Sequence, residues 1–346
     1  MKADLQERRE RIIETVVMAF METGKPVSSA FVSSVCGLGL SPASIRSIMK
    51  ELEKEGLLAQ RHTSAGRIPT VKCYRYYVKH LMKETDLSEL EQRVIKNIIE
   101  EGMRDHDTDL FINHMVSTLS EVTDLIGVAL SPGFERGIFD KIEILNLGGS
   151  SYLLVLSLKS GFVNTIRITI DHIIPRWKIE ETARIITERL HDLSISDIND
   201  SIGLCLRDVA GGDRSLVEVI LTRSDRIFSF SDERNIHLAG LSRVLTHPDF
   251  EPADHSLKLI DMFEHKNEIV KALKLSASDE SNVSIHIGGN GPWGSRPPLS
   301  LVSAVYWSGS MMGVIGVIGP ARVHYPRLTA LVRYASASAS NYLSSC

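Results

Sequence analysis

The stretch 41-SPASIRSIMKELEKEGLLAQRHTSAGRIPTVKCYRYYV-78 decides the fold of the N-terminal third of the chain. Its first part has apolar residues at the i, i+3, i+4 and i+7 positions of one helix face, namely Ile45, Ile48, Met49 and Leu52. Ser41 is a good N-cap, Pro42 suits the first helical position, and Gly56 suits the C-terminal end. The pattern therefore predicts a helix between these two ends.

The segments on either side extend this helix into a small domain. Apolar periodicity predicts helices over 5–22 and 28–35, before the stretch. After it, residues 57–59 predict a short strand, and a new helix runs from Lys72 to about residue 83. Between them lies the polar loop HTSAGRIPT, residues 62–70. Three helices, a strand, a loop and a further helix predict a winged helix-turn-helix, with the loop as the wing.

The front of the predicted recognition helix is polar and basic. Arg46 lies near the N-terminal end, where such helices touch base edges, so it is our candidate for a guanine contact. Ser44 and Ser47 suit bases or phosphates, whereas Lys50 and Lys54 suit phosphates. The alternative is a solvated basic face, and the acidic residues of the same helix favour that alternative: Glu51, Glu53 and Glu55.

The predicted wing offers a second set of candidate DNA contacts. Gly66 permits a tight turn, which places Arg67 at or beside the tip, where an arginine can enter a minor groove. The short hydroxyls of the wing suit phosphate oxygens, and basic residues flank it; these residues are Thr63, Ser64, Thr70, Arg61, His62 and Lys72. The alternatives are an ordinary surface turn, or an Arg67 that anchors the wing instead of touching DNA.

Charge is distributed unevenly along the chain. The net charge of −4 alone argues against a nucleic-acid partner. Residues 1–82, however, carry 13 Lys and Arg against 8 Asp and Glu, whereas the remainder carries 26 against 35. Within 41–82 the count is 8 against 3, so the basic excess lies beside the predicted helix and wing. This asymmetry supports DNA binding by the N-terminal third.

The rest of the chain predicts an α+β body. Residues 84–104 form a charged helical connector with one apolar stripe, which packs either on its own domain or on a second copy. Later strands, joined mostly by short turns and closed by a C-terminal helix, predict a sensor-like domain over 105–175 and 251–346. Residues 176–250 are expected to be an insertion, in which 217-VEVILT-222 is predicted as a strand.

Enzyme chemistry is not indicated. A GxGxxG pattern at 289–294 follows an apparent strand, but Pro297 and Pro298 prevent the helix that a dinucleotide site needs. The run DHDTD at 105–109 is expected to be a solvated turn rather than a metal site. The cysteines are far apart and form no CxxC pair; they are Cys36, Cys73, Cys205 and Cys346. We therefore expect no catalysis, no cofactor and no metal.

No membrane association is expected either. The longest apolar runs fall short of the ~18 residues of a membrane helix, and the charged N-terminus lacks the apolar stretch of a signal peptide. Widely spaced cysteines that stay reduced are typical of a cytoplasmic protein. The sequence predicts a cytoplasmic protein.

The stretch 41–78 resembles the N-terminal domain of the heat-inducible transcription repressor HrcA family. The family carries a similar recognition helix, the complete wing HTSAGRIPT, and a K-G-Y-R-x-Y-V segment after it. Further on, HLAGLSRVLTHPDF and VIGVIGPARVHYPRL, at 237–250 and 314–328, resemble two C-terminal family segments. The resemblance reaches both ends and is weakest over residues 84–235.

The chain departs from the family pattern at several positions. Ser47 replaces a usual Asn on the recognition helix, and Cys73 replaces a Gly before the tyrosines. Ala321, Val323 and His324 replace a Thr, a Met and commonly an Asp. The substitutions at Ser47 and Cys73 leave the prediction of DNA binding in place. They argue against an operator preference identical to that of the family. The other three weaken any family-specific contact near the C-terminus.

The resemblance implies a negative regulator of chaperone operons. It implies a homodimer that binds an inverted-repeat operator called CIRCE, residues 1–83 as the winged helix-turn-helix, a GAF-like body, and an inserted dimerisation domain. It also implies that the GroE chaperonin supports activity and that heat releases the DNA. Symmetry is expected independently, because one winged helix contacts only a few base pairs. A second hypothesis is a metabolite-sensing regulator whose GAF-like domain binds a small molecule.

Overall fold

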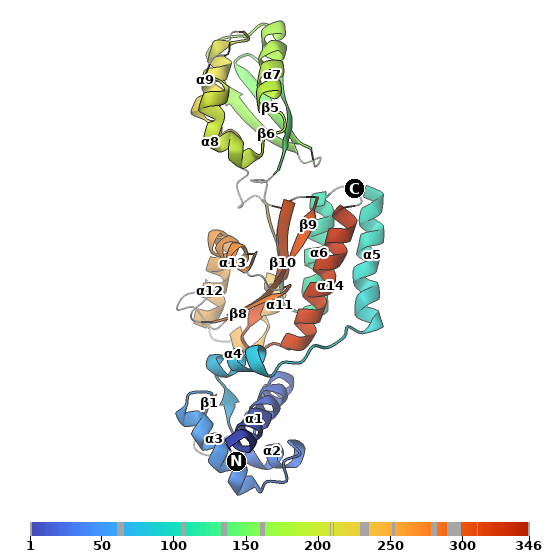
Figure 1. Cartoon of the computed structure of the whole chain (residues 1–346), viewed down its shortest axis with the longest axis vertical. Helices are drawn as coiled ribbons and strands as arrows, with labels where there is room; N and C mark the ends of the chain where they lie inside the picture. The colour runs from blue at the N-terminus through green and yellow to red at the C-terminus, as the bar shows by residue number, and fades with distance from the viewer. Residues whose placement is uncertain are drawn as a thin grey trace. The chain divides into compact units, whose positions relative to one another are not determined.

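The structure, a computed structural model of the chain (Figure 1), describes residues 2–60, 66–105, 108–132, 137–159, 163–207, 209, 211–228, 235–250, 253–277, 282–288, 299–309 and 311–344. It divides into two compact units. The first comprises Met1–Ala129, His237–Val305 and Val314–Tyr342, and the second comprises Leu130–Ile236, Tyr306–Gly313 and Leu343–Cys346. Helices and strands occur in both, so the chain is a mixed α+β protein.

The N-terminal domain, residues 2–80, has four helices and a two-stranded sheet. They are α1 (Lys2–Thr23), α2 (Ser29–Val35), α3 (Pro42–Lys54), β1 (Leu58–Ala59), β2 (Ile68–Pro69) and α4 (Val71–His80). Ser28, Ser41 and Thr70 cap α2, α3 and α4, each accepting a hydrogen bond at 3.2 Å from the backbone N–H three residues later. The predicted cap of α3 and the proline in its first turn are thereby confirmed.

The core of this domain lies between the helices. Buried apolar side chains come from α1, α2, α3 and α4 and include Ile12, Val16, Val32, Ile45, Leu52 and Tyr77. α1 contacts each of the other three helices, so it holds the domain together. Burying side chains of this size contributes about 1.5–3 kcal/mol each relative to exposure.

The remainder of the first unit, which we call the sheet domain, is built on a five-stranded sheet of order β7-β3-β10-β9-β8. The strands are β3 (Ile126–Leu130), β7 (Ile236–Ala239), β8 (Ser284–Ile287), β9 (Leu299–Ser308) and β10 (Met311–Pro320). The helices are α5 (Glu89–Asp105), α6 (Thr108–Thr123), α11 (Leu241–Leu245), η2 (Pro248–Phe250), α12 (Ala253–Glu264), α13 (Asn267–Ala277) and α14 (Tyr325–Leu343). Figure 1 shows α5, α6 and α14 on one side of the sheet and α12 and α13 on the other. Covered on both faces, β3 and β10 are apolar and almost wholly buried.

The connector predicted over 84–104 packs within its own domain. α5 contacts α6 and buries Ile95 and Ile98. Arg327 of α14 donates to a carboxylate oxygen of Glu91 at 2.6 Å and so holds the first turn of α5. This packing is the first of the two alternatives that the sequence leaves open, and pairing of α5 with a second copy stays a prediction.

α4 connects the N-terminal domain to the sheet domain. Arg75 donates from Nε and Nη2 to the backbone oxygen of Ile287, at 2.8 and 2.6 Å, and from Nη2 also to that of Gly288. Beside it, the ring of Tyr74 lies 6.0 Å from the ring of Tyr325 at the start of α14. An arginine and an aromatic pair therefore join the last helix of one domain to the sheet and a helix of the other.

The inserted unit interrupts the chain between β3 and β7. It has a three-stranded antiparallel sheet of order β4-β5-β6, with β4 (Phe139–Gly148), β5 (Ser151–Leu158) and β6 (Val163–Thr169). The helices that follow are α7 (Arg176–Leu190), α8 (Ile195–Cys205), α9 (Arg214–Thr222) and α10 (Ser224–Ile227). Every second residue of β5 is buried, so one face of the sheet packs on the helices.

The limits of this unit differ from the insertion expected over 176–250. Strands β4–β6 pair with one another, and Phe139 and Tyr152 share a buried cluster with Ile186 and Ile220 of the helices. Residues after 236 instead pair in the five-stranded sheet as β7. Long-range pairing therefore moves both boundaries toward the N-terminus.

The prediction of a strand over 217–222 is wrong, because this segment is the C-terminal part of α9. Asp213 caps the helix by accepting from the backbone N–H of Leu216 at 3.2 Å. Leu216, Val217 and Ile220 are buried at helical spacing. A short apolar run fits either element, and the cap before it selects the helix.

Among the described residues, none of the helices combines the length and the apolar composition needed to cross a bilayer.

Candidate nucleic-acid interface

Helix α3 has one buried face and one exposed face. Ile45, Met49 and Leu52 are buried against the rest of the N-terminal domain. The candidate contact residues all lie on the exposed face: Ser44, Arg46, Ser47, Lys50 and Lys54. The helix therefore presents three cations, two hydroxyls and the carboxylate of Glu51 to solvent on an apolar support.

The first turn of α3 is held by serine hydroxyls. Ser41 Oγ accepts from the backbone N–H of Ser44 and lies 3.0 Å from Ser44 Oγ. Because the two hydroxyls share one hydrogen bond, the Ser44 side chain is already oriented before any ligand arrives. Arg46 and Ser47 are the second and third residues after Ser44.

The last turn of α3 is held by α1 and by the segment around α4. Arg9 of α1 donates to the carboxylate of Glu55, and this hydrogen bond lowers the pKa of that carboxyl. Lys72 Nζ donates to the backbone oxygen of Glu55 at 2.8 Å. Thr70 Oγ1 lies 2.7 Å from the backbone oxygen of Gly56, while its other role is to cap α4. Thr70 and Lys72, both candidates for phosphate contacts, thus have partners within the domain.

Arg67 also has a partner within the domain. Its Nε donates to Glu53 Oε2 of α3 at 2.9 Å, and its side chain is only 11% exposed. Its backbone N–H and C=O both pair with Val27, between α1 and α2, at 2.8 Å. A Cβ on Gly66 would lie 2.4 Å from the Val27 oxygen, so only glycine fits at this close approach. The sequence pattern did not predict Glu53 as the partner of Arg67. It indicated only that this carboxylate would be repelled by DNA.

The other wing candidates lie outside the described residues. Arg61, His62, Thr63 and Ser64 fall in the segment 61–65 between β1 and β2. Their assignment to DNA stays a prediction. The GxGxxG pattern at 289–294 and the adjacent prolines also lie outside the described part of the chain.

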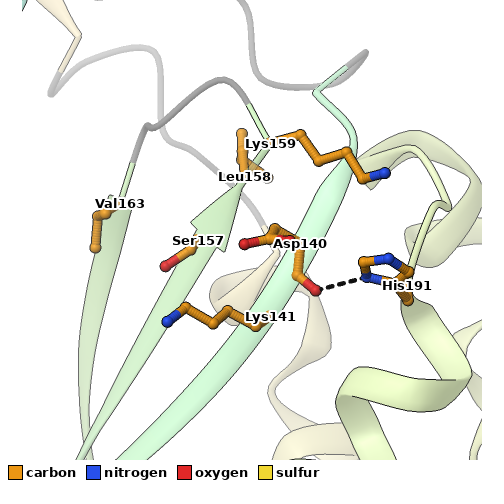
Figure 2. A pocket seen from close by; sticks show the side chains of 7 residues that line it. All are labelled: Asp140, Lys141, Ser157, Leu158, Lys159, Val163 and His191. Carbon is orange, nitrogen blue, oxygen red and sulfur yellow. Dashed lines mark hydrogen bonds between the residues drawn. The ribbon is translucent and has the colours of Figure 1, made fainter.

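A hollow in the inserted unit bears on the small-molecule hypothesis. It has a volume of about 650 Å³ and is lined by Asp140, Lys141, Ser157, Leu158, Lys159, Val163 and His191 (Figure 2). Lys141 Nζ pairs with Glu143 at 2.7 Å, and Lys159 pairs with Asp192. The imidazole of His191 lies 2.9 Å from the backbone oxygen of Asp140, as Figure 2 shows. An anion entering here would have to displace carboxylates that already hold both amines.

Metal chemistry has no support in the described residues, which hold no group of three or more His, Cys, Asp or Glu side chains placed to bind an ion.

Comparison with known proteins identifies the family. Residues 109–329 match the family model described as the HrcA protein C terminal domain. A relative from Chlorobium luteolum, named heat-inducible transcription repressor HrcA, is 32% identical and covers 96% of this chain and 95% of its own. A relative of the same name from Chlorobium phaeobacteroides strain BS1 is 30% identical and covers 99% of both chains.

A solved structure shares the fold. A crystal structure of a hypothetical protein at 2.2 Å resolution matches with a TM-score of 0.59 at 19% identity and covers 98% of both chains. At this identity the similarity concerns the fold alone. The family model over 109–329 and the relatives that span nearly the whole length, N-terminal domain included, together show that this chain belongs to the HrcA family.

Proposed function

We propose that this chain is a heat-inducible transcription repressor that inserts α3 into the major groove of double-stranded DNA. The observation that carries the proposal is the exposed cationic face of α3 over a buried apolar back. The names of the relatives support the biological role, negative control of heat-shock genes. No catalytic step belongs to this function.

The proposal assigns the N-terminal domain as a winged helix-turn-helix. Helices α2 and α3 are the helix-turn-helix pair, α1 supports both, and β1 and β2 are the base of the wing. The sheet domain is assigned as GAF-like. Without the inserted unit, its strands run 2-1-5-4-3 across the sheet in chain order, and the GAF-like assignment follows from the family resemblance.

Each candidate contact residue of α3 has a proposed role. Arg46, near the N-terminal end, donates to the edge of a guanine. Ser44 and Ser47 contact bases or phosphates, and Lys50 and Lys54 bind phosphates. Arg61, His62, Thr63 and Ser64 supply further contacts from the wing.

We infer that a homodimer binds the two halves of an inverted repeat, the CIRCE operator. The inserted unit offers a surface for a second copy, because Leu145, Leu147 and Val163 are exposed on one face of its sheet. Leu145 stands opposite Leu153 in the register, which extends the apolar patch onto β5. Burying this face would place two N-terminal domains in one particle, as a two-fold operator requires.

The test is an anisotropy titration of operator DNA against scrambled DNA at several salt concentrations. Arg46→Ala should cost about 1–3 kcal/mol on the operator and relax specificity at one base pair. Lys50→Ala should weaken both DNAs and reduce the salt slope by about 0.9. Lys271→Ala, an exposed lysine on α13, is the matched control and should change neither. Equal affinity of the unaltered protein for both DNAs would sink the proposal.

Temperature and chaperonin define the regulation that we propose. Operator binding should fall across the heat-shock range and return when GroE chaperonin is added, because the chaperonin restores the folded dimer. Binding that persists through that range without any effect of chaperonin contradicts this regulation and leaves DNA binding itself intact.

The metabolite-sensing alternative expects a pocket in the GAF-like domain, whereas the hollow of Figure 2 lies in the inserted unit and its two lysine side chains are already paired with carboxylates. A small carboxylate or phosphate compound that raises the melting temperature and changes operator affinity in parallel would support it. Lys159→Ala should abolish that shift if the hollow is the site.

A further inference from the structure

We propose that Arg67 is a positioning residue, which fixes the wing to the recognition helix through Glu53 and does not itself contact DNA. The inference rests on the proposed function and deepens it. The arginine of the wing HTSAGRIPT is thereby assigned to a contact within the N-terminal domain.

The first argument is connectivity. Arg67 joins three segments at once: its side chain reaches Glu53 on α3, its backbone pairs with Val27 between α1 and α2, and it precedes β2 directly. Because the next strand residue, Ile68, pairs with Ala59 of β1, the start of the wing is tied to its end. Arg67 therefore helps to set the angle between the wing and the recognition helix, together with the bonds of Thr70 and Lys72 to the end of α3.

The second argument is burial. A guanidinium that enters a minor groove must present its donors to solvent in the free protein, whereas Arg67 is 11% exposed. Moving it to DNA would break the 2.9 Å pair and leave the Glu53 carboxylate, itself 33% exposed, without its cation beside a phosphate backbone. The exposed Arg46 and Lys50 of α3 carry no such cost.

The third argument is electrostatic. Glu53 lies one helical turn beyond Lys50, on the helix that we place in the groove. An isolated carboxylate there would be repelled by DNA. Pairing with Arg67 neutralises it, so the same contact that orients the wing also removes a repulsive charge from the interface.

The test compares Arg67→Met, Glu53→Ala and the double variant in full-length protein. Methionine keeps most of the apolar stem of Arg67 and removes its charge. If Arg67 is a positioning residue, each single variant should lower the ratio of operator to scrambled affinity about tenfold, and the double variant should match either single one. The salt slope of the double variant, which removes the cation and the anion together, should equal that of the unaltered protein, whereas Lys50→Ala reduces it by about 0.9.

A direct contact of Arg67 with DNA predicts a different salt slope and an opposite change in operator affinity. If Arg67 binds a phosphate, the double variant flattens the salt slope by about one, and Glu53→Ala raises operator affinity because a repelling charge is gone. That pair of results would overturn the inference.

Hydrogen exchange separates this inference from the proposed function. In protein without DNA, the amides of Val27 and Arg67 should exchange faster in Glu53→Ala than in the unaltered chain, because the backbone pair loses its side-chain support. If the unaltered chain shows no operator preference, the proposed function fails, and the exchange result still decides the inference. Unchanged exchange at both amides rejects it.

Discussion

Replacing Gly66 by alanine should open the wing from the body of the N-terminal domain. The added Cβ would lie 2.4 Å from the backbone oxygen of Val27 and 2.5 Å from its carbon. Both atoms belong to the backbone, so no side-chain rotation relieves the clash. The two backbone hydrogen bonds between Val27 and Arg67, each 2.8 Å long, must therefore break.

The expected magnitude follows from those two hydrogen bonds. Each contributes about 1 kcal/mol net, so we expect a local loss of roughly 2 kcal/mol in the opening free energy of this segment. Operator affinity should fall as well, because the wing loses its fixed angle to α3.

Gly203→Ala is the matched control. Gly203 lies inside α8, its φ is not positive, and an added Cβ meets nothing within 4 Å. Alanine in a helix interior is favoured over glycine by about 0.5–1 kcal/mol, so this variant should be slightly more stable. The same chemical change thus has opposite predicted signs at the two positions.

Hydrogen exchange at single amides is the suitable assay. The tryptophans, Trp177, Trp293 and Trp307, all lie outside the N-terminal domain, so their fluorescence does not report its unfolding. A chain with two compact units also need not unfold in one step. Unchanged protection of the Val27 and Arg67 amides in Gly66→Ala would refute the reasoning, as would equal effects of the two glycine variants.

Three further predictions concern stability. Ser41→Ala should destabilise the first turn of α3 by about 1 kcal/mol, because the backbone N–H of Ser44 loses its acceptor, and the exchange rate of that amide measures the loss. Burial lowers the pKa of His237, so the folded chain resists a proton that the unfolded chain takes up below about pH 6.5. The free energy of unfolding should therefore decline as the pH falls below that value, and His237→Gln should reduce this decline in urea titrations at each pH. Arg75→Met should cost about 1–3 kcal/mol, since the backbone oxygen of Ile287 loses its donors, and should lower the melting temperature more than Lys271→Ala does.

Local signals were sufficient for α3, whereas the helix predicted from Lys72 to about residue 83 ends at His80. The periodicity of α3 and its serine cap depend on residues within one or two turns of each other, so the sequence alone predicts them. The exposed face with Arg46 and Lys50 follows from the same periodicity. The ends of α3 and the burial of Ile45, Met49 and Leu52 therefore needed no tertiary information, whereas Ile48 of the same predicted face is half-buried.

Contacts between distant segments could not be predicted in this way. Arg67 and Glu53 are 14 residues apart, and only the fold of the wing decides whether the arginine faces DNA or the helix. The edges of the inserted unit likewise depend on which sheet each strand joins. The run 217–222 fits a strand and a helix equally well because it has only six residues, and the Asp213 cap before it is what distinguishes the helix.

The contact of Arg75 with the sheet domain is chemically one-sided. Its acceptors are main-chain oxygens of Ile287 and Gly288, which every amino acid possesses. Substitutions at position 287 can therefore accumulate over evolution without removing the acceptor. The donor, in contrast, is the guanidinium of Arg75, which only an arginine at this position provides. Inheritance of these hydrogen bonds thus depends on the side chain at position 75, so an alignment of relatives should show variation at position 287 and little at position 75.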